Sequence, residues 1–187
     1  FINIRPQTLL MKKLLLLNPP GKKIYIRDYY CSKVSKSNYI YHPVDLLVLS
    51  GRLYGKYDLQ VIDAIAERIS HDVCIKMILN MRPDIIIFQS GSVSVEEDFP
   101  FMSEIKNSLK NVLLLGSGDV FNENGVELMK EQHWLDAIIL DFSTDDTLKY
   151  LEDKAPNNMI YRKNNEIIEA KLVREKWTGF ELPVPRH

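Results

Sequence analysis

Three apolar runs that end abruptly in small or acidic residues dominate the hydrophobic pattern of the chain. They begin at Ile85, Val112 and Ala137, and apolar and polar residues do not alternate within them. Continuous runs of this length are typical of strands buried on both faces of a parallel sheet. Because ligands of open α/β sheets bind beyond the carboxyl ends of the strands, the residues that follow these runs predict a binding edge.

Two further strands are expected before these runs, at 13–17 and 57–63. Between and after the strands, apolar residues recur at helical spacing. Helices are expected at 44–53, 64–81, 95–109, 122–134 and 145–151, and the 64–81 segment could instead hold a separate helix capped at Ser70. Five strand–helix repeats predict an α/β fold: a flavodoxin-like (Rossmann-like) doubly wound parallel sheet of five strands in the order 2-1-3-4-5.

The pattern changes after Pro156. Two short β-type runs, Met159–Arg162 and Glu166–Glu169, flank a polar turn and predict a C-terminal β-hairpin. A proline-punctuated end follows, typical of a linker. We therefore divide the chain into an N-terminal extension (1–12), an α/β domain (13–155), a hairpin appendage (156–172) and a linker (173–187).

Charge and cysteine content exclude several classes of protein. The formal net charge of the 187 residues is −1, which argues against a nucleic-acid partner. The two cysteines, Cys31 and Cys74, are too few for a disulfide framework or a zinc site, so we expect a cytoplasmic protein. The N-terminal apolar stretch is split by Lys12 and Lys13, so we expect no membrane span and no export signal.

The loops exclude several common chemistries. The first strand ends in Asn18-Pro19-Pro20-Gly21 and not in the glycine pattern of a dinucleotide site, and no P-loop pattern occurs. A receiver domain would need an aspartate where the third strand has Gln89 and Ser90. The four histidines are scattered, and only His42 lies at the expected edge, so no Ser-His-Asp arrangement is evident.

What remains is a candidate site of hydroxyls and backbone amides. Small residues let a ligand approach the backbone, and free amides and hydroxyls bind phosphate or amide groups. Ordinary strand-to-helix turns with capping serines are the alternative for each single loop. The candidate ligand-binding residues are Asn18, Pro19, His42, Ser90, Gly91, Ser92, Val93, Ser94, Gly116, Ser117, Gly118, Asp119, Asp141, Phe142 and Ser143.

The order of several motifs resembles a known family. Leu16-Leu17-Asn18-Pro19-Pro20, His42-Pro43 before a helix, Tyr57–Ala64, Pro83–Ile87 and Ile105-Lys106 follow one another as in the N-terminal cobalamin-binding domain of radical S-adenosylmethionine enzymes. That family includes the anaerobic magnesium-protoporphyrin monomethyl ester cyclase and many methyltransferases. The resemblance covers about residues 13 to 169. It implies that the chain binds cobalamin and presents it to a downstream catalytic barrel.

The chain departs from related cobalamin domains in ways that affect this interpretation. It has no D-x-H-x-x-G motif, whose histidine binds cobalt in those domains, so the resemblance implies cobalamin bound base-off without such a ligand. It leaves His42 as a candidate cobalt ligand, although a surface role is commoner for a loop histidine. Ser90 and Gly116 match the family's tail-channel motifs only at single positions.

The catalytic half of such an enzyme has no counterpart in this sequence. The cluster motif C-x-x-x-C-x-x-C is missing, so the resemblance places S-adenosylmethionine and a [4Fe-4S] cluster in a separate radical domain and implies no catalysis by this chain alone. The alternatives are a flavodoxin-like domain that binds a nucleotide-like ligand at the same loops, and an interaction scaffold without a small ligand.

Overall fold

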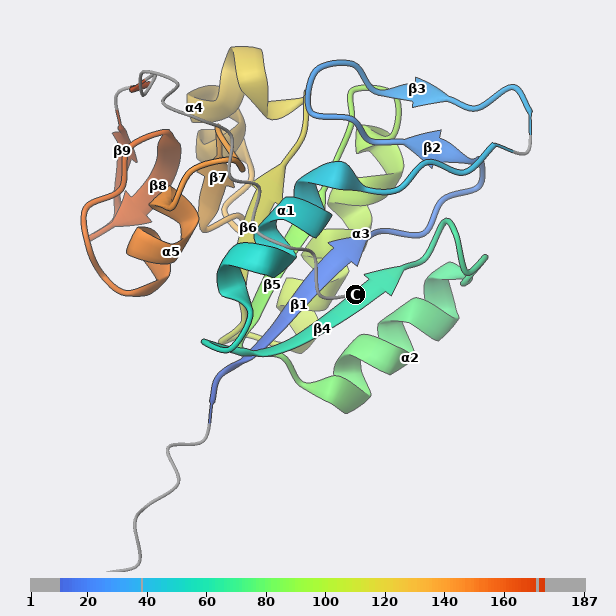
Figure 1. Cartoon of the computed structure of the whole chain (residues 1–187), viewed down its shortest axis with the longest axis horizontal. Helices are drawn as coiled ribbons and strands as arrows, with labels where there is room; N and C mark the ends of the chain where they lie inside the picture. Colours follow the sequence, from blue (N-terminus) through green and yellow to red (C-terminus); the bar gives the residue numbers. More distant parts are fainter. Residues whose placement is uncertain (1–10, 38, 171, 174–187) are drawn as a thin grey trace, which may run out of the picture.

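A single mixed sheet forms the centre of the protein (Figure 1). The computed structural model describes residues 11–37, 39–170 and 172–173. The sheet has seven strands in the order β4-β1-β5-β6-β7-β8-β9. Its strands are β1 (Lys13–Asn18), β4 (Asp58–Asp63), β5 (Ile85–Gln89), β6 (Leu113–Ser117), β7 (Ala137–Ile139), β8 (Met159–Lys163) and β9 (Glu166–Glu169).

The first five strands of the sheet are parallel and have the predicted order 2-1-3-4-5. The predicted hairpin also forms, and it extends the same sheet: β8 pairs antiparallel with β7, with Ile138 opposite Ile160. Met159 and Ile160 are buried, which explains why this hairpin packs as part of the sheet. Most of the predicted extension and linker, residues 1–10 and 174–187, lies outside the described residues.

Five helices connect and cover the strands. They are α1 (Val44–Leu53), α2 (His71–Met81), α3 (Val95–Ser108), α4 (Phe121–Glu131) and α5 (Asp146–Leu151). The continuous helix expected over 64–81 is wrong in its first part, because residues 64–68 form turns. There the Asp63 side chain accepts a hydrogen bond from the Ala66 amide (3.0 Å), and Arg68 has a φ of 54°. The helix starts only after Ser70, the alternative N-cap.

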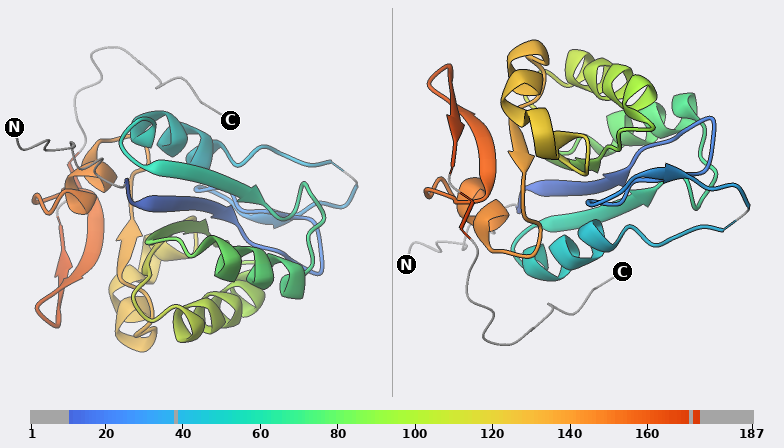
Figure 2. Two further views of the ribbon diagram at one scale, coloured as in Figure 1. Left: turned by 90° about the horizontal axis from the view of Figure 1, so that it is seen from below. Right: turned by 90° about the horizontal axis from the view of Figure 1, so that it is seen from above.

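The two faces of the sheet carry two separate hydrophobic cores (Figure 2). Along β1, Leu15 and Leu17 face the core under α2, α3 and α4, whereas Leu14 and Leu16 face the core under α1 and α5. Side chains of a strand point alternately to its two faces, and here both faces are buried. This alternation also decides the face to which each residue at the carboxyl ends of the strands belongs.

The connection between β1 and α1 is the longest in the fold. It contains a two-stranded ribbon of β2 (Tyr25–Ile26) and β3 (Lys33–Val34). We name residues 19–43 the edge loop. In Figure 1 this segment lies beyond the ends of the central strands, where a ligand of a doubly wound sheet is expected.

Candidate functional site

The edge loop crosses the carboxyl ends of three strands and is tied to each of the loops that follow them. Its Ser32 amide donates a hydrogen bond to Asp119, after β6 (2.8 Å). The hydroxyl of Tyr29 donates to the carbonyl of Leu140, after β7. Its Arg27 side chain reaches α3, after β5. The expected binding edge is therefore covered by the chain itself.

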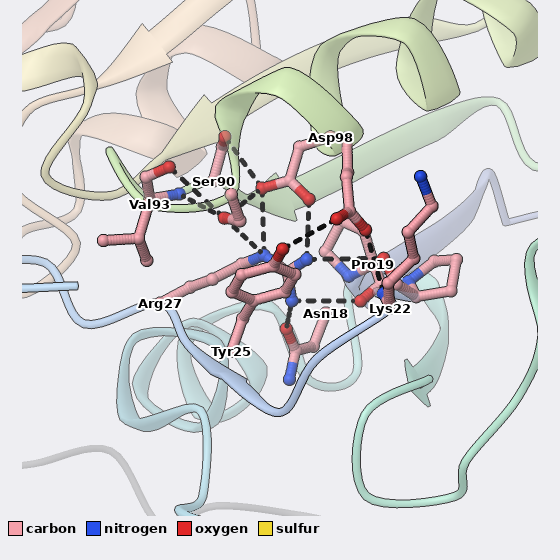
Figure 3. A network of polar contacts seen from close by, with 12 residues as sticks. Asn18, Pro19, Lys22, Tyr25, Arg27, Ser90, Val93 and Asp98 are labelled. Carbon is pink, nitrogen blue, oxygen red and sulfur yellow. Dashed lines mark hydrogen bonds and ion pairs between the residues drawn. The ribbon is translucent and has the colours of Figure 1, made fainter. Parts of the chain in front are cut away.

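Arg27 is the centre of a buried polar network (Figure 3). Its Nη2 and Nε donate to Oδ1 and Oδ2 of Asp98 at 2.6 and 2.9 Å, and both side chains are fully buried. Nη1 also donates to Asn18 Oδ1 (2.9 Å) and to the Pro19 carbonyl (3.0 Å). A buried guanidinium with a bidentate carboxylate and two further acceptors has most of its hydrogen bonds satisfied. This network attaches the edge loop to the helical layer.

The hydroxyls predicted to face a ligand after β5 belong to the same network. Ser90 Oγ and Ser94 Oγ donate to Asp98 Oδ2 at 2.9 and 2.7 Å, and both residues are buried. Ser94 precedes α3 as its N-cap residue, but its hydroxyl makes no capping bond to the helix. The structure thus brings these two serines together, around a carboxylate of the protein.

The backbone amides of this loop are also occupied. Gly91 N–H donates to Ser94 Oγ (3.2 Å) and Val93 N–H to Ser32 Oγ (3.4 Å). Ser92 N–H donates to Asp119 Oδ1 (2.9 Å). A phosphate bound here would have to displace these acceptors and would meet the charge of Asp119, so the loop is poorly suited to an anion.

The predicted small residues after β6 serve close packing. A β-carbon on Gly116 would lie 2.5 Å from Cζ of Phe121, whose ring fills that space. One on Gly118 would overlap the Ser90 carbonyl oxygen, and Gly118 has a φ of 130°, which favours glycine. These glycines permit contact between chain segments on the side of α3 and α4.

The opposite face of the same edge is polar and incompletely paired. Asn18, Gln89 and Ser117 are the last residues of β1, β5 and β6, and the alternation places them on the face of α1 and α5. All three are buried. Asn18 pairs with Asp63 (2.8 Å), but Ser117 Oγ has no hydrogen-bond partner among the described residues.

Three more polar atoms on this face are buried without a partner in the described part of the chain. They are Asp45 Oδ2 and Arg52 Nε of α1, and Thr147 Oγ1 of α5. Buried polar groups are nearly always hydrogen-bonded, and an unpaired one costs about 1–3 kcal/mol. Of these four residues, Asp45 also lines a cavity at the carboxyl ends of the strands, where a polar ligand could satisfy it.

The loop after β7 borders this region. Asp141 Oδ1 accepts hydrogen bonds from the amide and the hydroxyl of Ser143 (2.8 and 2.6 Å), and the Phe142 ring lies 5.4 Å from the ring of Tyr29. The other nitrogens of Arg52 contact this loop, at the Ser143 carbonyl and Asp145. The structure therefore brings Asp141, Phe142 and Ser143 to the α1–α5 side of the edge.

A cavity of about 130 Å³ opens at the carboxyl ends of β1 and β5. From β1 the chain passes through α1, on one face of the sheet, to the edge strand β4. It then passes through α2, on the other face, back to β5 on the far side of β1. The chain therefore reverses its direction across the sheet between β1 and β5. Such a switch point is the usual ligand position in doubly wound sheets. Asn18, His42, Asp45 and Gln89 are among its lining residues.

A larger cavity of about 480 Å³ lies on the other face, between α2 and α3. The half-buried Glu97 carboxylate at this cavity is satisfied, since it accepts hydrogen bonds from the Lys22 amide (2.9 Å) and the Tyr25 hydroxyl (2.7 Å). No unpaired buried polar atom of the described residues lines it. We therefore place the candidate site at the smaller cavity, at the switch point.

Three residues of this edge were not predicted from the sequence as site residues: Arg27, Asp98 and Asp45. Arg27 lies in a loop without periodicity, so nothing in the pattern predicts its burial. Asp45 carries a usable signal, because it is an acid in helical register with Leu49 and Leu53 on the buried side of α1. Asp98 likewise lies on the buried side of α3, one turn after Ser94.

None of the helices described is long and apolar enough to cross a membrane. Among the described residues, no group of three or more histidine, cysteine or acidic side chains is arranged to hold a metal ion.

Comparisons with known proteins agree with the fold. No family model matches the sequence, and no curated protein matches it. Two solved structures of the cobalamin-dependent S-adenosylmethionine radical enzyme OxsB are similar. The one with aqua-cobalamin and S-adenosylmethionine bound has a TM-score of 0.63 and 14% identity over 89% of this chain. The apo form has a TM-score of 0.57 and 15% identity over 92% of this chain.

The likeness covers 23% of the OxsB chain in both structures. At this level of identity it shows a shared fold. The chain thus has the doubly wound architecture of one part of a larger cobalamin-dependent enzyme.

Proposed function

We propose that this chain binds cobalamin at the α1–α5 side of the sheet edge, as the cofactor-carrying module of a radical S-adenosylmethionine enzyme. The observation that carries the proposal is the buried Asp45 carboxyl at the switch-point cavity, whose Oδ2 has no hydrogen-bond partner among the described residues. The shared fold with OxsB, whose structure contains aqua-cobalamin, supports the choice of ligand. Neither a dinucleotide motif nor a free anion-binding loop favours the nucleotide alternative.

The donor set suits this group. Cobalamin carries several amide side chains and a nucleotide tail, so it offers both donors and acceptors to hydroxyl, amide and carboxyl groups. Ser117, Gln89 and Asn18 would contact it from the strand ends, and Asp141, Phe142 and Ser143 from the loop after β7. We propose base-off binding, since the chain has no D-x-H-x-x-G histidine, with His42 at the cavity as the candidate lower ligand.

The edge loop has to move for a ligand of this size. A cavity of about 130 Å³ is far below the usual 300–1,000 Å³ of a ligand pocket. Arg27, Tyr29 and Ser32 make the contacts that hold the edge loop across the strand ends. We propose that these contacts break when the ligand binds. In the absence of ligand, Ser90–Ser94 and Gly116–Asp119 would hold the edge loop in the closed position.

When bound, cobalamin supplies a cobalt centre that accepts and transfers a methyl group or tunes a radical step. The residues of this chain bind and orient it. The edge loop excludes water from the face that it covers. We propose that catalysis itself belongs to a radical domain that brings S-adenosylmethionine and the iron–sulfur cluster.

A visible-absorbance titration with hydroxocobalamin tests the proposal. Saturable binding with a base-off spectrum is expected for the wild type. Ser117→Ala keeps the fold but removes one hydrogen bond, so affinity should fall about 3- to 10-fold. Ser117→Leu places a larger apolar side chain at this buried strand end and should abolish binding.

The matched control is Ser108→Leu, at an exposed position at the end of α3. It should bind like the wild type. If the Ser117 variants also bind like the wild type, the site is not on the α1–α5 side. If the wild type and a chain joined to a radical domain both fail to bind, the cobalamin proposal is wrong.

A further inference from the structure

Asp45 is an acid at a position where α1 otherwise has apolar residues. It lies on the buried side of the helix and is 4% exposed. Carboxylates are almost never this buried unless they are paired. The Gln89 side chain hydrogen-bonds the carboxyl group, but Oδ2 has no hydrogen-bond partner within the described residues. The protein therefore holds an unused acceptor in its interior.

The cations around the cavity are engaged elsewhere. Arg27 is paired with Asp98, and Lys33 Nζ lies 5.4 Å from the centre of the Tyr41 ring. Burial raises the pKa of Asp45 to about 6, and the like charge of the nearby Asp28 contributes to this rise. Of the basic residues that line this cavity, Arg27, Lys33 and His42, none forms an ion pair with the Asp45 carboxylate within the described residues.

The cavity that Asp45 lines has room for a small chemical group. Its volume of about 130 Å³ is that of roughly four liquid water molecules at ~30 Å³ each, which leaves enough room for one primary amide or ammonium group. On the solvent side it is bounded by Asp28, Lys33 and Tyr41 of the edge loop, which are exposed.

We propose that this cavity is a binding subsite for an N–H group of the ligand, a primary amide or an ammonium, which donates to Oδ2 of Asp45. An unpaired buried acceptor is satisfied by a donor and is left unsatisfied by an apolar group. A carboxylate or phosphate would meet the like charges of Asp45 and Asp28. The inference rests on the proposed function in so far as the N–H belongs to an amide side chain of cobalamin.

The first test compares hydroxocobalamin with its b-, d- and e-monocarboxylic acids, in each of which one corrin amide has become a carboxylate. The wild type should bind at least one of the acids about tenfold more weakly than the amide form, since hydrogen bonds to charged groups are worth about 1.5–3 kcal/mol. Asp45→Asn should remove this preference. Asp28→Asn leaves Oδ2 in place and should retain it. Equal amide-to-acid ratios in the wild type and Asp45→Asn would overturn the inference while leaving cobalamin binding intact.

The second test does not depend on cobalamin. The ¹³C NMR signal of the Asp45 carboxyl, assigned by its loss in Asp45→Asn, is followed with methylammonium chloride and with tetramethylammonium chloride at equal ionic strength. Both cations carry one positive charge, but only the first has N–H groups. A saturable shift with methylammonium alone supports the subsite. The same response to both salts, or no response to either, contradicts it even if the chain proves not to bind cobalamin.

Discussion

The guanidinium of Arg27 and the carboxylate of Asp98 form a bidentate ion pair that is completely sealed from solvent, although 71 positions separate them in the sequence. The pair joins the edge loop to the first turn of α3 (Figure 3). Ser90 and Ser94 complete the hydrogen bonds of the carboxylate. The position of the edge loop over the candidate site therefore depends on this pair.

Replacing Arg27 should destabilise the protein strongly. Arg27→Ala leaves Asp98 buried without its cation, and breaking a buried pair in this way costs about 3–5 kcal/mol. The free energy of unfolding from urea titrations measures the loss. The matched control is Lys154→Ala, which breaks the exposed ion pair with Glu152. It should cost less than about 1 kcal/mol, and a similar cost for both variants would contradict the assignment.

The same variant should also release the edge loop. Lys22, Lys23 and Lys33 lie in this loop and are exposed, so they are potential trypsin sites. In Arg27→Ala, trypsin should cleave within residues 19–43 faster than in the wild type, because the loop has lost its attachment to α3. The two proteins are compared under conditions in which their free energies of unfolding are equal. Mass spectrometry of limited digests identifies the cut. Unchanged cleavage in this loop would show that Arg27 does not hold it.

Two glycines with positive φ should respond differently to alanine. At Gly55 (φ 75°) nothing lies within 4 Å of the added β-carbon, so Gly55→Ala costs only backbone strain of about 1–2 kcal/mol. At Gly118 (φ 130°) the β-carbon also overlaps the Ser90 carbonyl. Gly118→Ala should therefore be clearly the more destabilising in thermal unfolding. Equal costs would mean that β6 and the loop after β5 are not packed as closely as described.

Asp45 should make the protein less stable as pH rises. Burial and the charge of Asp28 raise its pKa from 3.8 to about 6 in the folded state. Below pH 3.8 the carboxyl is protonated in both states. Between 3.8 and about 6 the unfolded chain loses this proton first, so the Asp45 contribution to stability falls by roughly 3 kcal/mol in all.

Asp45→Asn should accordingly stabilise the protein at pH 7 and have little effect at pH 3.5. Urea titrations at both pH values measure the difference between variant and wild type. Asp28→Asn serves as a comparison, since it removes only the neighbouring charge and should stabilise by less. A stabilisation by Asp45→Asn that does not change with pH would disagree with the buried, pKa-shifted carboxyl.

The two cysteines should differ in reactivity. Cys31 is exposed in the edge loop, whereas Cys74 lies on the buried side of α2 and burial raises its pKa to about 12. Because the thiolate is the reactive form, a disulfide reagent should modify one thiol per chain rapidly and the second only on unfolding. Cys31→Ser should remove the fast phase, and Cys74→Ser should retain it.

The sheet could be predicted because its signal is local. Ile85–Phe88 and Leu113–Leu115 are buried on both faces, so their apolar runs are continuous, and their order along the chain with intervening helices fixes a doubly wound sheet. The turn after β4 could not be predicted from the local pattern in this way. Its residues keep the helical spacing of Ile65 and Ile69, but the Asp63 side chain binds the backbone there and delays the helix.

The site was predictable as an edge and less so as a set of contacts. The sequence indicates which loops meet, since β5, β6 and β7 are parallel and their carboxyl ends lie at the same edge of the sheet. It does not reveal that Asp98 accepts the hydroxyls of Ser90 and Ser94 while it pairs with Arg27, because Arg27 comes from a loop without periodicity. Which face of the edge keeps unpaired polar atoms follows only from the packing of α1 and α5.

Equilibrium dialysis against hydroxocobalamin and flavin mononucleotide, each alone and then in competition, tests the central claim most directly. The account predicts that hydroxocobalamin is retained at one molecule per chain and that flavin mononucleotide neither accumulates nor competes. Retention of the flavin with no retention of hydroxocobalamin, by this chain and by the chain joined to a radical domain, would contradict the account and favour a nucleotide-binding domain.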